Sequence, residues 1–528
     1  MANERTFEPI AIETTKTFAY GECAKEGAAA FKYRWFAPKV EEGKTYPLVV
    51  FLHGSGERGE DNELQVAGNI GAYGYALPEN QAKYPCYVLA PQCPTDMNFT
   101  LPEFELGFMQ LLREFISANA IDKYRVYLTG LSMGGMGTWY YISKYPRLFA
   151  AALPICGGGN PYTISAAKHI PVWACHAVDD PFVPIDGIMG SGMVGTRRMV
   201  EALRSCGGEV HMTEYPAGYI AARYPFPPEF AGHAAWEPAY RDEEIRDWLF
   251  AQNRKTRDEY ELVKPGVWFF NDYYDASYYM VEGRDKVLLI DTGMGESPIM
   301  PLIRTLTDKP VELAVTHIHG DHMLHADEFD KIYIGEADRP LLPECISVMM
   351  PGLQLDEDKI CWLKGGEVFD LGGTEVEAIS LPGHTPGSMV FADRKHKCLF
   401  TGDAIGSGII VLMSVPGALN VSAYKAELET FAEKAKEFED YIWLGGHRYQ
   451  ERGGAFGNYY ETLDAQPMGY NPLHRRLVLD MIELCSKLLS GEVDAEEIPP
   501  FNGKPAGEPT YRAFYGSAGM IYLQSQVK

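Results

Sequence analysis

Short apolar runs alternate with amphipathic stretches along the first half of the chain. Uninterrupted runs such as PLVVFLHG predict buried strands, whereas the spacing of apolar residues in LGFMQLLREFISANA predicts a helix. Strands are expected over residues 47–54, 87–92, 126–130 and 171–180, and helices over 106–120 and 243–252. Strands that alternate with helices in this way favour a mostly parallel sheet with helices on both faces.

The pattern changes near residue 254. Segment 254–261 is charged and lacks apolar periodicity, so we interpret it as a linker between a domain over 1–253 and a second over 262–528. A chain of 528 residues is also too long for one ordinary core. The second half is expected to contain a strand over 286–293 within a hairpin-rich sheet, and amphipathic helices over 425–441 and 473–492.

Charge and cysteine usage narrow the possible partners and the compartment. The net charge of −25 repels phosphate backbones, so nucleic acid is not expected as a partner. No apolar run reaches about 18 residues, and the first residues lack the apolar core of a signal peptide, so no membrane partner is expected. The ten cysteines form no CxxC pair, which is typical of a reducing compartment and predicts a cytoplasmic protein.

The first candidate site centres on GLSMG at 130–134, which follows a predicted strand and precedes an apparent helix. In that context Ser132 sits on a tight turn, and the flanking glycines prevent clashes. An acid is available in HAVDDPFVP and a histidine, His233, in GHAAWEPAY. These residue types predict nucleophilic catalysis, in which Ser132 attacks a carbonyl, His233 transfers the proton and a carboxylate orients the imidazole.

Together with LHGSGERGEDN and the APQCP segment, these motifs resemble the esterase and predicted-peptidase branch of the α/β-hydrolases over residues 15–252. The relatives include dienelactone-hydrolase-like and feruloyl-esterase-like enzymes. The resemblance selects Asp180, which directly precedes Pro-x-Val-Pro, as the acid, although Asp179 stays open. It also implies an oxyanion hole made by the backbone N–H groups of Ser55 and Met133. The remaining histidines of this half are interpreted as structural: His53, His169, His176 and His211.

The second candidate site begins at THIHGDH, residues 316–322, after a short apolar strand. His317 and His319 alternate on an extended loop and can reach one metal ion, whereas Asp321 and His322 follow a turn and can reach a second. Additional ligands must come from other strand ends. Three downstream positions are framed by glycine and follow apolar runs: His384, Asp403 and His447.

This set resembles the metallo-β-lactamase superfamily over roughly residues 260–528, which implies an αββα sandwich. The likeness assigns the ligands of the first metal as His317, His319 and His384. It assigns those of the second as Asp321, His322 and His447, with Asp403 as the bridge. Asp291 matches a supporting aspartate. His325 is interpreted as a helix-surface or supporting histidine.

Two divalent ions are therefore expected, with zinc favoured by the histidine-rich set and iron or manganese left open. Such a pair would hold a bridging hydroxide, which Asp321 can orient, and would polarise a substrate oxygen. The acidic charge disfavours the nucleases of the superfamily. A small-molecule ester, lactone, thioester or lactam is the expected substrate.

Two complete residue sets favour a bifunctional hydrolase, with a carboxylesterase-type serine site fused to a dinuclear metallohydrolase. One alternative is a single catalytic domain joined to a substrate-binding or assembly module. Another is a β-lactam-hydrolysing enzyme, although enzymes that protect the cell wall act outside the cytosol and no export signal is visible. The sequence does not indicate an oligomeric state.

Overall fold

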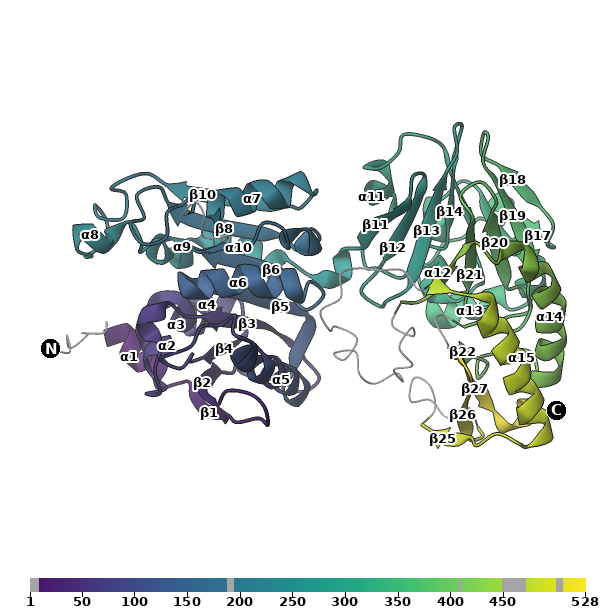
Figure 1. The fold of residues 1–528 in the computed structure, drawn as a ribbon, viewed down its shortest axis with the longest axis horizontal. Coiled ribbons are helices and arrows are strands. Elements are labelled where there is room, and N and C mark those ends of the chain that lie inside the picture. The colour runs from purple at the N-terminus through teal and green to yellow at the C-terminus, as the bar shows by residue number, and fades with distance from the viewer. Residues whose placement is uncertain (1–8, 188–193, 407–409, 449–471, 500–506) are drawn as a thin grey trace. The chain divides into compact units, whose positions relative to one another are not determined.

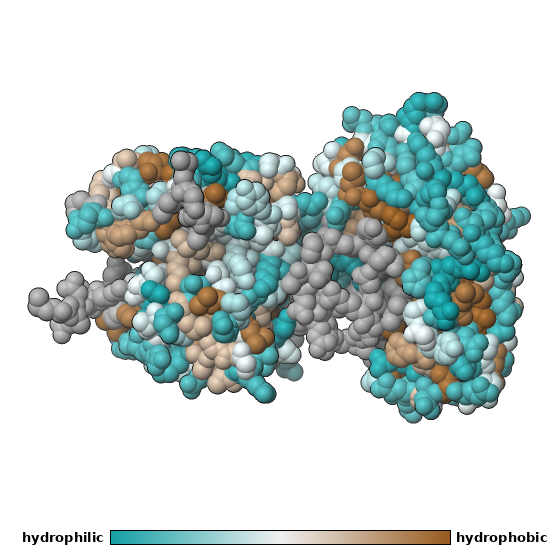
Figure 2. Space-filling model, in the orientation of Figure 1, coloured by the Kyte–Doolittle hydropathy of each residue, from teal (hydrophilic) through white to brown (hydrophobic). Residues whose placement is uncertain are grey.

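The computed structural model describes residues 9–187, 194–406, 410–448, 472–499 and 507–528 (Figure 1). Contacts divide the chain into two compact units, and the division falls between Arg254 and Lys255. On the face drawn in Figure 2, hydrophilic residues predominate and hydrophobic residues form small separate patches. Among the described helices, none is long and apolar enough to cross a membrane.

The N-terminal unit is built on an eight-stranded sheet in the order β1-β2-β4-β3-β5-β6-β8-β10. The strands are β1 (Ala19–Cys23), β2 (Phe31–Phe36), β3 (Tyr46–Leu52), β4 (Tyr87–Pro91), β5 (Ile121–Leu131), β6 (Ala151–Ile155), β8 (Val172–Ala177) and β10 (Val210–Tyr215). Pairing is antiparallel from β1 through β2 to β4 and parallel from β4 to β10. The predicted mostly parallel sheet is confirmed.

Helices cover both faces of this sheet. They are α1 (Pro9–Thr15), α2 (Leu64–Ala67), α3 (Ile70–Ala76), α4 (Pro78–Lys83), α5 (Pro102–Ala118), α6 (Met133–Lys144), α7 (Thr196–Ser205), α8 (Pro228–Ala231), α9 (Trp236–Arg241) and α10 (Glu243–Ala251). Phe51 of β3 shares a core with Tyr240 of α9. Its neighbour Leu52 faces α6, because a Cβ on Gly137 would lie 3.0 Å from the Leu52 Cδ1. A strand buried on both faces requires apolar residues throughout, which explains the uninterrupted run in β3.

The C-terminal unit contains two sheets packed face to face and a small third sheet. The first is β11 (Glu259–Lys264), β12 (Val267–Asn271), β13 (Ser277–Glu282), β14 (Val287–Ile290), β15 (Val311–Ala314), β16 (Ile332–Gly335) and β17 (Ile360–Leu363). The second is β18 (Val368–Asp370), β19 (Glu375–Ser380), β20 (Met389–Asp393), β21 (Cys398–Gly402), β23 (Ile442–Gly445) and β24 (Pro472–Leu473). The third is β22 (Ile410–Leu412), β27 (Ala518–Leu523), β26 (Thr510–Tyr515) and β25 (Glu496–Ile498). Phe269, Tyr279 and Phe400 fill the core between the first two sheets.

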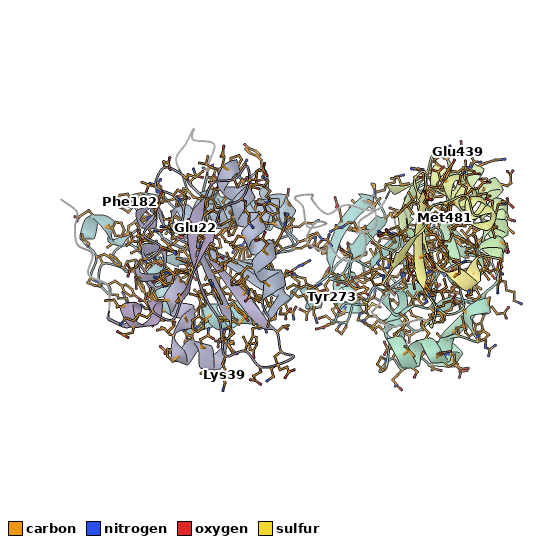
Figure 3. All side chains as sticks on the ribbon, turned by 90° about the horizontal axis from the view of Figure 1, so that it is seen from below. Glu22, Lys39, Phe182, Tyr273, Glu439 and Met481 are labelled. Carbon is orange, nitrogen blue, oxygen red and sulfur yellow. The ribbon has the colours of Figure 1, made fainter. Side chains whose placement is uncertain are left out.

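Helices close the outer faces of the sandwich. On the first sheet lie α11 (Met300–Arg304), α12 (Gly320–Met323) and α13 (Leu342–Met349), and on the second lie α14 (Val421–Lys434) and α15 (Arg475–Ser490). Met481 of α15, labelled in Figure 3, is buried in the same core as Leu399 of β21. The predicted αββα layering is confirmed. The helix expected over 425–441 starts earlier, because the Asn420 side chain accepts the Ala423 N–H and caps it.

The predicted linker 254–261 is shorter than the charge pattern indicated. Its last residues belong to β11, which pairs antiparallel with β12. The Tyr260 ring lies 6.2 Å from that of Trp268 and 6.1 Å from that of Phe270, so aromatic contacts hold the strand in place. A strand at the edge of a sheet tolerates charged residues, and this is why its composition resembled a linker.

Two candidate active sites

Ser132 lies on a strained turn between β5 and α6. Its backbone has φ 54° and ψ −116°, a conformation that a residue with a side chain rarely adopts. A Cβ on Gly134 would lie 1.9 Å from the Leu52 carbonyl oxygen, and one on Gly130 would lie 2.4 Å from the Gly134 oxygen. Both glycines of GLSMG are therefore required by close backbone approach, as in a nucleophile elbow.

The structure brings Ser132, His233 and Asp180 into one hydrogen-bonded chain. The Ser132 Oγ lies 2.9 Å from His233 Nε2, and His233 Nδ1 lies 2.7 Å from Asp180 Oδ2. Although burial opposes ionisation, hydrogen bonds from His176 and His233 lower the pKa of Asp180 to about 2. Asp179, the alternative acid, instead accepts the Gly218 N–H at 2.8 Å.

The two segments predicted to form the oxyanion hole flank Ser132. Ser55 begins a short 3₁₀ turn, and a Cβ on the preceding Gly54 would lie 3.7 Å from the Ser132 Cβ. Met133 is the first residue of α6, where a backbone N–H has no acceptor within the helix. His53 accepts the Cys93 N–H and contacts the Gly54 carbonyl, so it supports the loop, as expected.

A cavity of about 440 Å³ is lined in part by Met133, the residue that follows Ser132. Its apolar lining includes Phe99, Met133 and Trp139, and its polar lining includes Asn98 and Asn160. This volume falls within the range of small-molecule pockets. Aromatic side chains lie next to His233 as well. The ring of Phe182, which is labelled in Figure 3, is half-exposed. It lies 5.3 Å from the His233 ring and 5.6 Å from the Phe230 ring.

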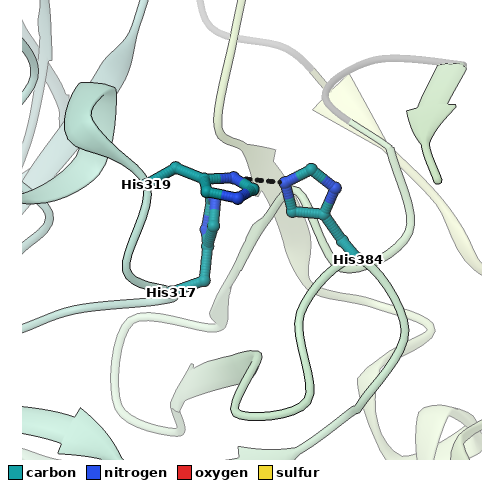
Figure 4. A group of neighbouring side chains, drawn as sticks. All are labelled: His317, His319 and His384. Atoms are coloured by element: carbon teal, nitrogen blue, oxygen red, sulfur yellow. Dashed lines mark hydrogen bonds between the residues drawn. The ribbon is translucent and has the colours of Figure 1, made fainter. Parts of the chain in front are cut away.

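In the C-terminal unit, three histidines from two loops converge on one point. His317 and His319 follow β15, and His384 lies in the loop between β19 and β20 (Figure 4). The His319 Nδ1 and the His384 Nε2 are 2.9 Å apart. Burial, followed by the neighbouring imidazoles, holds the pKa of His317 well below its usual range, and the pKa of His319 falls to about 3. Neutral imidazoles are the form that binds a metal.

A second group lies next to the first. His447 Nε2 is 3.0 Å from the Asp321 carboxylate, and His322 Nε2 is 3.7 Å from it. The Asp403 carboxylate faces both groups, at 3.8 Å from His384 Nε2 and 3.7 Å from His447 Nε2. The structure therefore brings all seven predicted ligands together, with Asp403 between the two sets.

Supporting groups orient the imidazoles from behind. Asp291, held at φ 64°, accepts the Nδ1–H of His322 at 2.8 Å and the Thr316 hydroxyl at 2.8 Å. The Leu412 carbonyl accepts from His384 Nδ1 at 2.6 Å. In contrast, His325 contacts Glu328 and the Gly295 carbonyl rather than the cluster. Such second hydrogen bonds fix which nitrogen faces a metal.

The geometry of the cluster suits metal ions. The Nε2 atoms of His317 and His322 are buried, and neither has a hydrogen-bond partner among the described residues. Burying such atoms without a partner is costly. A metal ion would satisfy both. Beside His319 lies an apolar hollow of about 100 Å³ lined by Ile318, Leu341 and Met349.

One residue that contacts Asp180 was predicted from the sequence to be structural. His176 is buried and its Nε2 lies 3.1 Å from the Asp180 Oδ2. The available signal was its position four residues before Asp180, within the strand predicted over 171–180. Nothing in the sequence shows that both side chains turn towards each other.

Comparisons with known proteins match the C-terminal unit most directly. The model of the metallo-beta-lactamase superfamily matches residues 272–447. YobT of Bacillus subtilis (strain 168) is 31% identical over 30% of this chain and 76% of its own length. The acyl-coenzyme A thioesterase MBLAC2 of Gallus gallus is 24% identical over 27% of this chain, which spans 64% of that relative's length.

Among solved structures, a thermostable esterase is 40% identical over 46% of this chain and 64% of its own, with a TM-score of 0.42. The family model covers every residue of the histidine and aspartate cluster, from His317 to His447. Because this model matches and YobT is covered over most of its length, the chain belongs to the metallo-beta-lactamase superfamily.

Proposed function

We propose that the chain is a bifunctional hydrolase of small-molecule carboxylic-acid derivatives. The observation that supports this proposal most is that one chain holds a hydrogen-bonded serine–histidine–aspartate set and a second cluster of seven histidine and aspartate side chains that could bind metal. Free thiols at all ten cysteines support a reducing, cytoplasmic location.

At the serine site, Ser132 forms the acyl-enzyme. His233 Nε2 accepts the hydroxyl proton as Oγ attacks the carbonyl carbon, and it returns that proton to the departing alcohol. Asp180 keeps the imidazole in the tautomer that leaves Nε2 free to accept. The N–H groups of Ser55 and Met133 stabilise the developing oxyanion. The cavity lined by Met133 and Trp139 would hold the body of the ester.

At the metal cluster, His317, His319 and His384 would hold one divalent ion and Asp321, His322 and His447 a second, with Asp403 between them. Zinc suits this histidine-rich donor set. When bound, the ions supply Lewis-acid polarisation of an acyl carbonyl and lower the pKa of water. Asp291 fixes the orientation of the His322 imidazole, and the Leu412 carbonyl fixes that of His384. The Asp321 carboxylate can accept a hydrogen bond from the attacking water.

The substrate class of the second site is an ester or thioester with an apolar acyl group. The hollow beside His319 is lined mainly by apolar side chains and would take such a group. The matched thioesterase supports a thioester, although this chain spans only 64% of its length.

The test is hydrolysis of a small aryl acetate by wild type, Ser132→Ala and His384→Ala, with metal content measured in each. We expect Ser132→Ala to abolish this activity and retain the metals. We expect His384→Ala to keep the activity and lose metal. If the activity survives Ser132→Ala and disappears on metal removal, the serine site is not the esterase. If only one site acts on any ester or thioester in a panel, the other unit is a binding module.

A further inference from the structure

The hydrogen bonds that link Ser132 to His233 and His233 to Asp180 continue to a fourth residue, which is His176. It is the fifth residue of β8 (Val172–Ala177) and is fully buried. Its ring contacts three polar groups: the Asp180 carboxylate and the Val183 carbonyl through Nε2, and the Thr196 hydroxyl through Nδ1. The protonation of His176 follows from what each of these partners can donate.

The Nε2 atom of His176 must carry a hydrogen. It lies 2.8 Å from the Val183 carbonyl oxygen and 3.1 Å from the Asp180 Oδ2. A carbonyl oxygen only accepts, and an ionised carboxylate only accepts. The Asp180 carboxylate is ionised at neutral pH because hydrogen bonds outweigh the effect of burial on its pKa.

The Nδ1 atom of His176 must carry a hydrogen as well. Its partner, Thr196 Oγ1, lies 2.7 Å away and has a single hydrogen to give. That same Oγ1 lies 2.6 Å from the Gly157 carbonyl oxygen, which can only accept. The hydroxyl hydrogen therefore points at Gly157, and the oxygen lone pair faces Nδ1.

The surroundings provide a counter-charge for a cation here. Asp180 Oδ2 contacts both His176 and His233, so one carboxylate oxygen is shared by two imidazoles. On the neighbouring strand, Glu214 is in register with His176, but its carboxylate already pairs with Arg197 of α7. Arg197 also binds Asp186. The nearby Cys156 thiol stays neutral because burial raises its pKa.

We propose that His176 is an imidazolium that acts as a positioning residue, sharing the Asp180 charge with His233. The inference rests on the proposed serine site. A carboxylate shared with a fixed cation attracts a proton onto His233 less strongly than a carboxylate that faces His233 alone. His176 thus keeps His233 available as a base at lower pH and holds Asp180 in line with it.

The first test is nuclear magnetic resonance of the full chain labelled with ¹⁵N-histidine at neutral pH. We expect one buried histidine with both ring nitrogens protonated, and we expect its signals to disappear in His176→Gln. The exposed His211 supplies the control, because His211→Gln should leave these signals in place. A single-tautomer, neutral ring at position 176 would overturn the proposal without any measurement of turnover.

The second test is the pH profile of kcat/KM for aryl acetate hydrolysis. With His176→Gln, the acidic limb should move to higher pH, because Asp180 then acts on His233 alone. Thr196→Val removes the Nδ1 acceptor and should produce a shift in the same direction. A lower kcat with an unmoved limb in both variants would indicate a merely structural His176. If Ser132→Ala retains the activity, the proposed function fails, while the resonance test of His176 still stands.

Discussion

Replacing Gly134 with alanine tests the packing that forms the nucleophile elbow. The new Cβ would lie 1.9 Å from the Leu52 carbonyl oxygen and 2.8 Å from that of His53, whereas non-bonded heavy atoms normally stay about 3.5 Å apart. Helix α6 must therefore move from β3 by more than about 1 Å. Overpacking of this kind costs about 3 kcal/mol, while the better helix propensity of alanine returns about 1 kcal/mol.

We therefore expect Gly134→Ala to destabilise the N-terminal unit by about 2 kcal/mol or more and to lower kcat/KM about 100-fold, because Ser132 and the Met133 N–H are displaced. Urea unfolding followed by circular dichroism measures the stability, with the transition of the C-terminal unit as an internal reference. The rate is measured with an aryl acetate.

Gly137→Ala is the matched control in the same helix. Its Cβ would meet the Leu52 Cδ1 at 3.0 Å and the Phe99 Cβ at 3.0 Å. The Leu52 Cδ1 is the end of a flexible side chain, and both contacts are more than 1 Å longer than the 1.9 Å contact at Gly134. This variant should stay within about 1 kcal/mol of wild type and keep its activity, since the propensity gain offsets the crowding. Wild-type stability and rate in Gly134→Ala would refute the proposed role of the close backbone contact.

Further predictions concern the charges and the metals. Asp180→Asn should lower kcat by about 10³ to 10⁴-fold with little change in KM, because the amide no longer holds the proper tautomer of His233. Steady-state kinetics measures this loss, and a loss of less than tenfold would count against the triad. Because folding lowers the pKa of Asp180 from 3.8 to about 2, its ionisation adds about 2 kcal/mol of stability above about pH 4, which is lost as the pH falls towards 2. The difference in unfolding free energy between wild type and Asp180→Asn should therefore shrink from about pH 5 to about pH 3, and a constant gap would contradict this linkage. A chelator should lower the melting temperature of the C-terminal unit and leave serine esterase activity intact, since bound ions stabilise only the unit that holds them; calorimetry with unchanged melting would argue against resident metals.

The local motifs could be predicted from the sequence because they depend on backbone conformation over a few residues. The order strand, GLSMG, helix places Ser132 at a tight turn whatever the rest of the chain does, and the alternation in THIHGDH puts His317 and His319 on one side. The layers of the N-terminal unit also followed from periodicity, because burial on one face or on two sets the spacing of apolar residues. The αββα layers of the C-terminal unit, in contrast, were predicted from a family resemblance. Strand β11 was missed, since an edge strand can carry charge.

Contacts between segments that are distant along the chain could not be predicted from the sequence in the same way. The choice between Asp179 and Asp180 rested on a resemblance, and only the tertiary structure places Asp180 against His233, 53 residues later. His176 looked like an ordinary core histidine until the partners of its two nitrogens were known. Which of two adjacent side chains faces a partner depends on the path of the loop, and adjacent residues have the same local pattern.

The sequence by itself therefore determined the residue types, their order and the strands and loops that carry them. The tertiary structure alone decided which atoms meet. It determined the shared Asp180 oxygen and the position of Asp403 between two sets of predicted ligands. It also left the Nε2 atoms of His317 and His322 without a hydrogen-bond partner within the described part of the chain. The physical reason is that secondary structure follows from short-range sterics and apolar spacing. Hydrogen bonds and metal ligation need positions correct to a few tenths of an ångström, and only the packed sheets supply them.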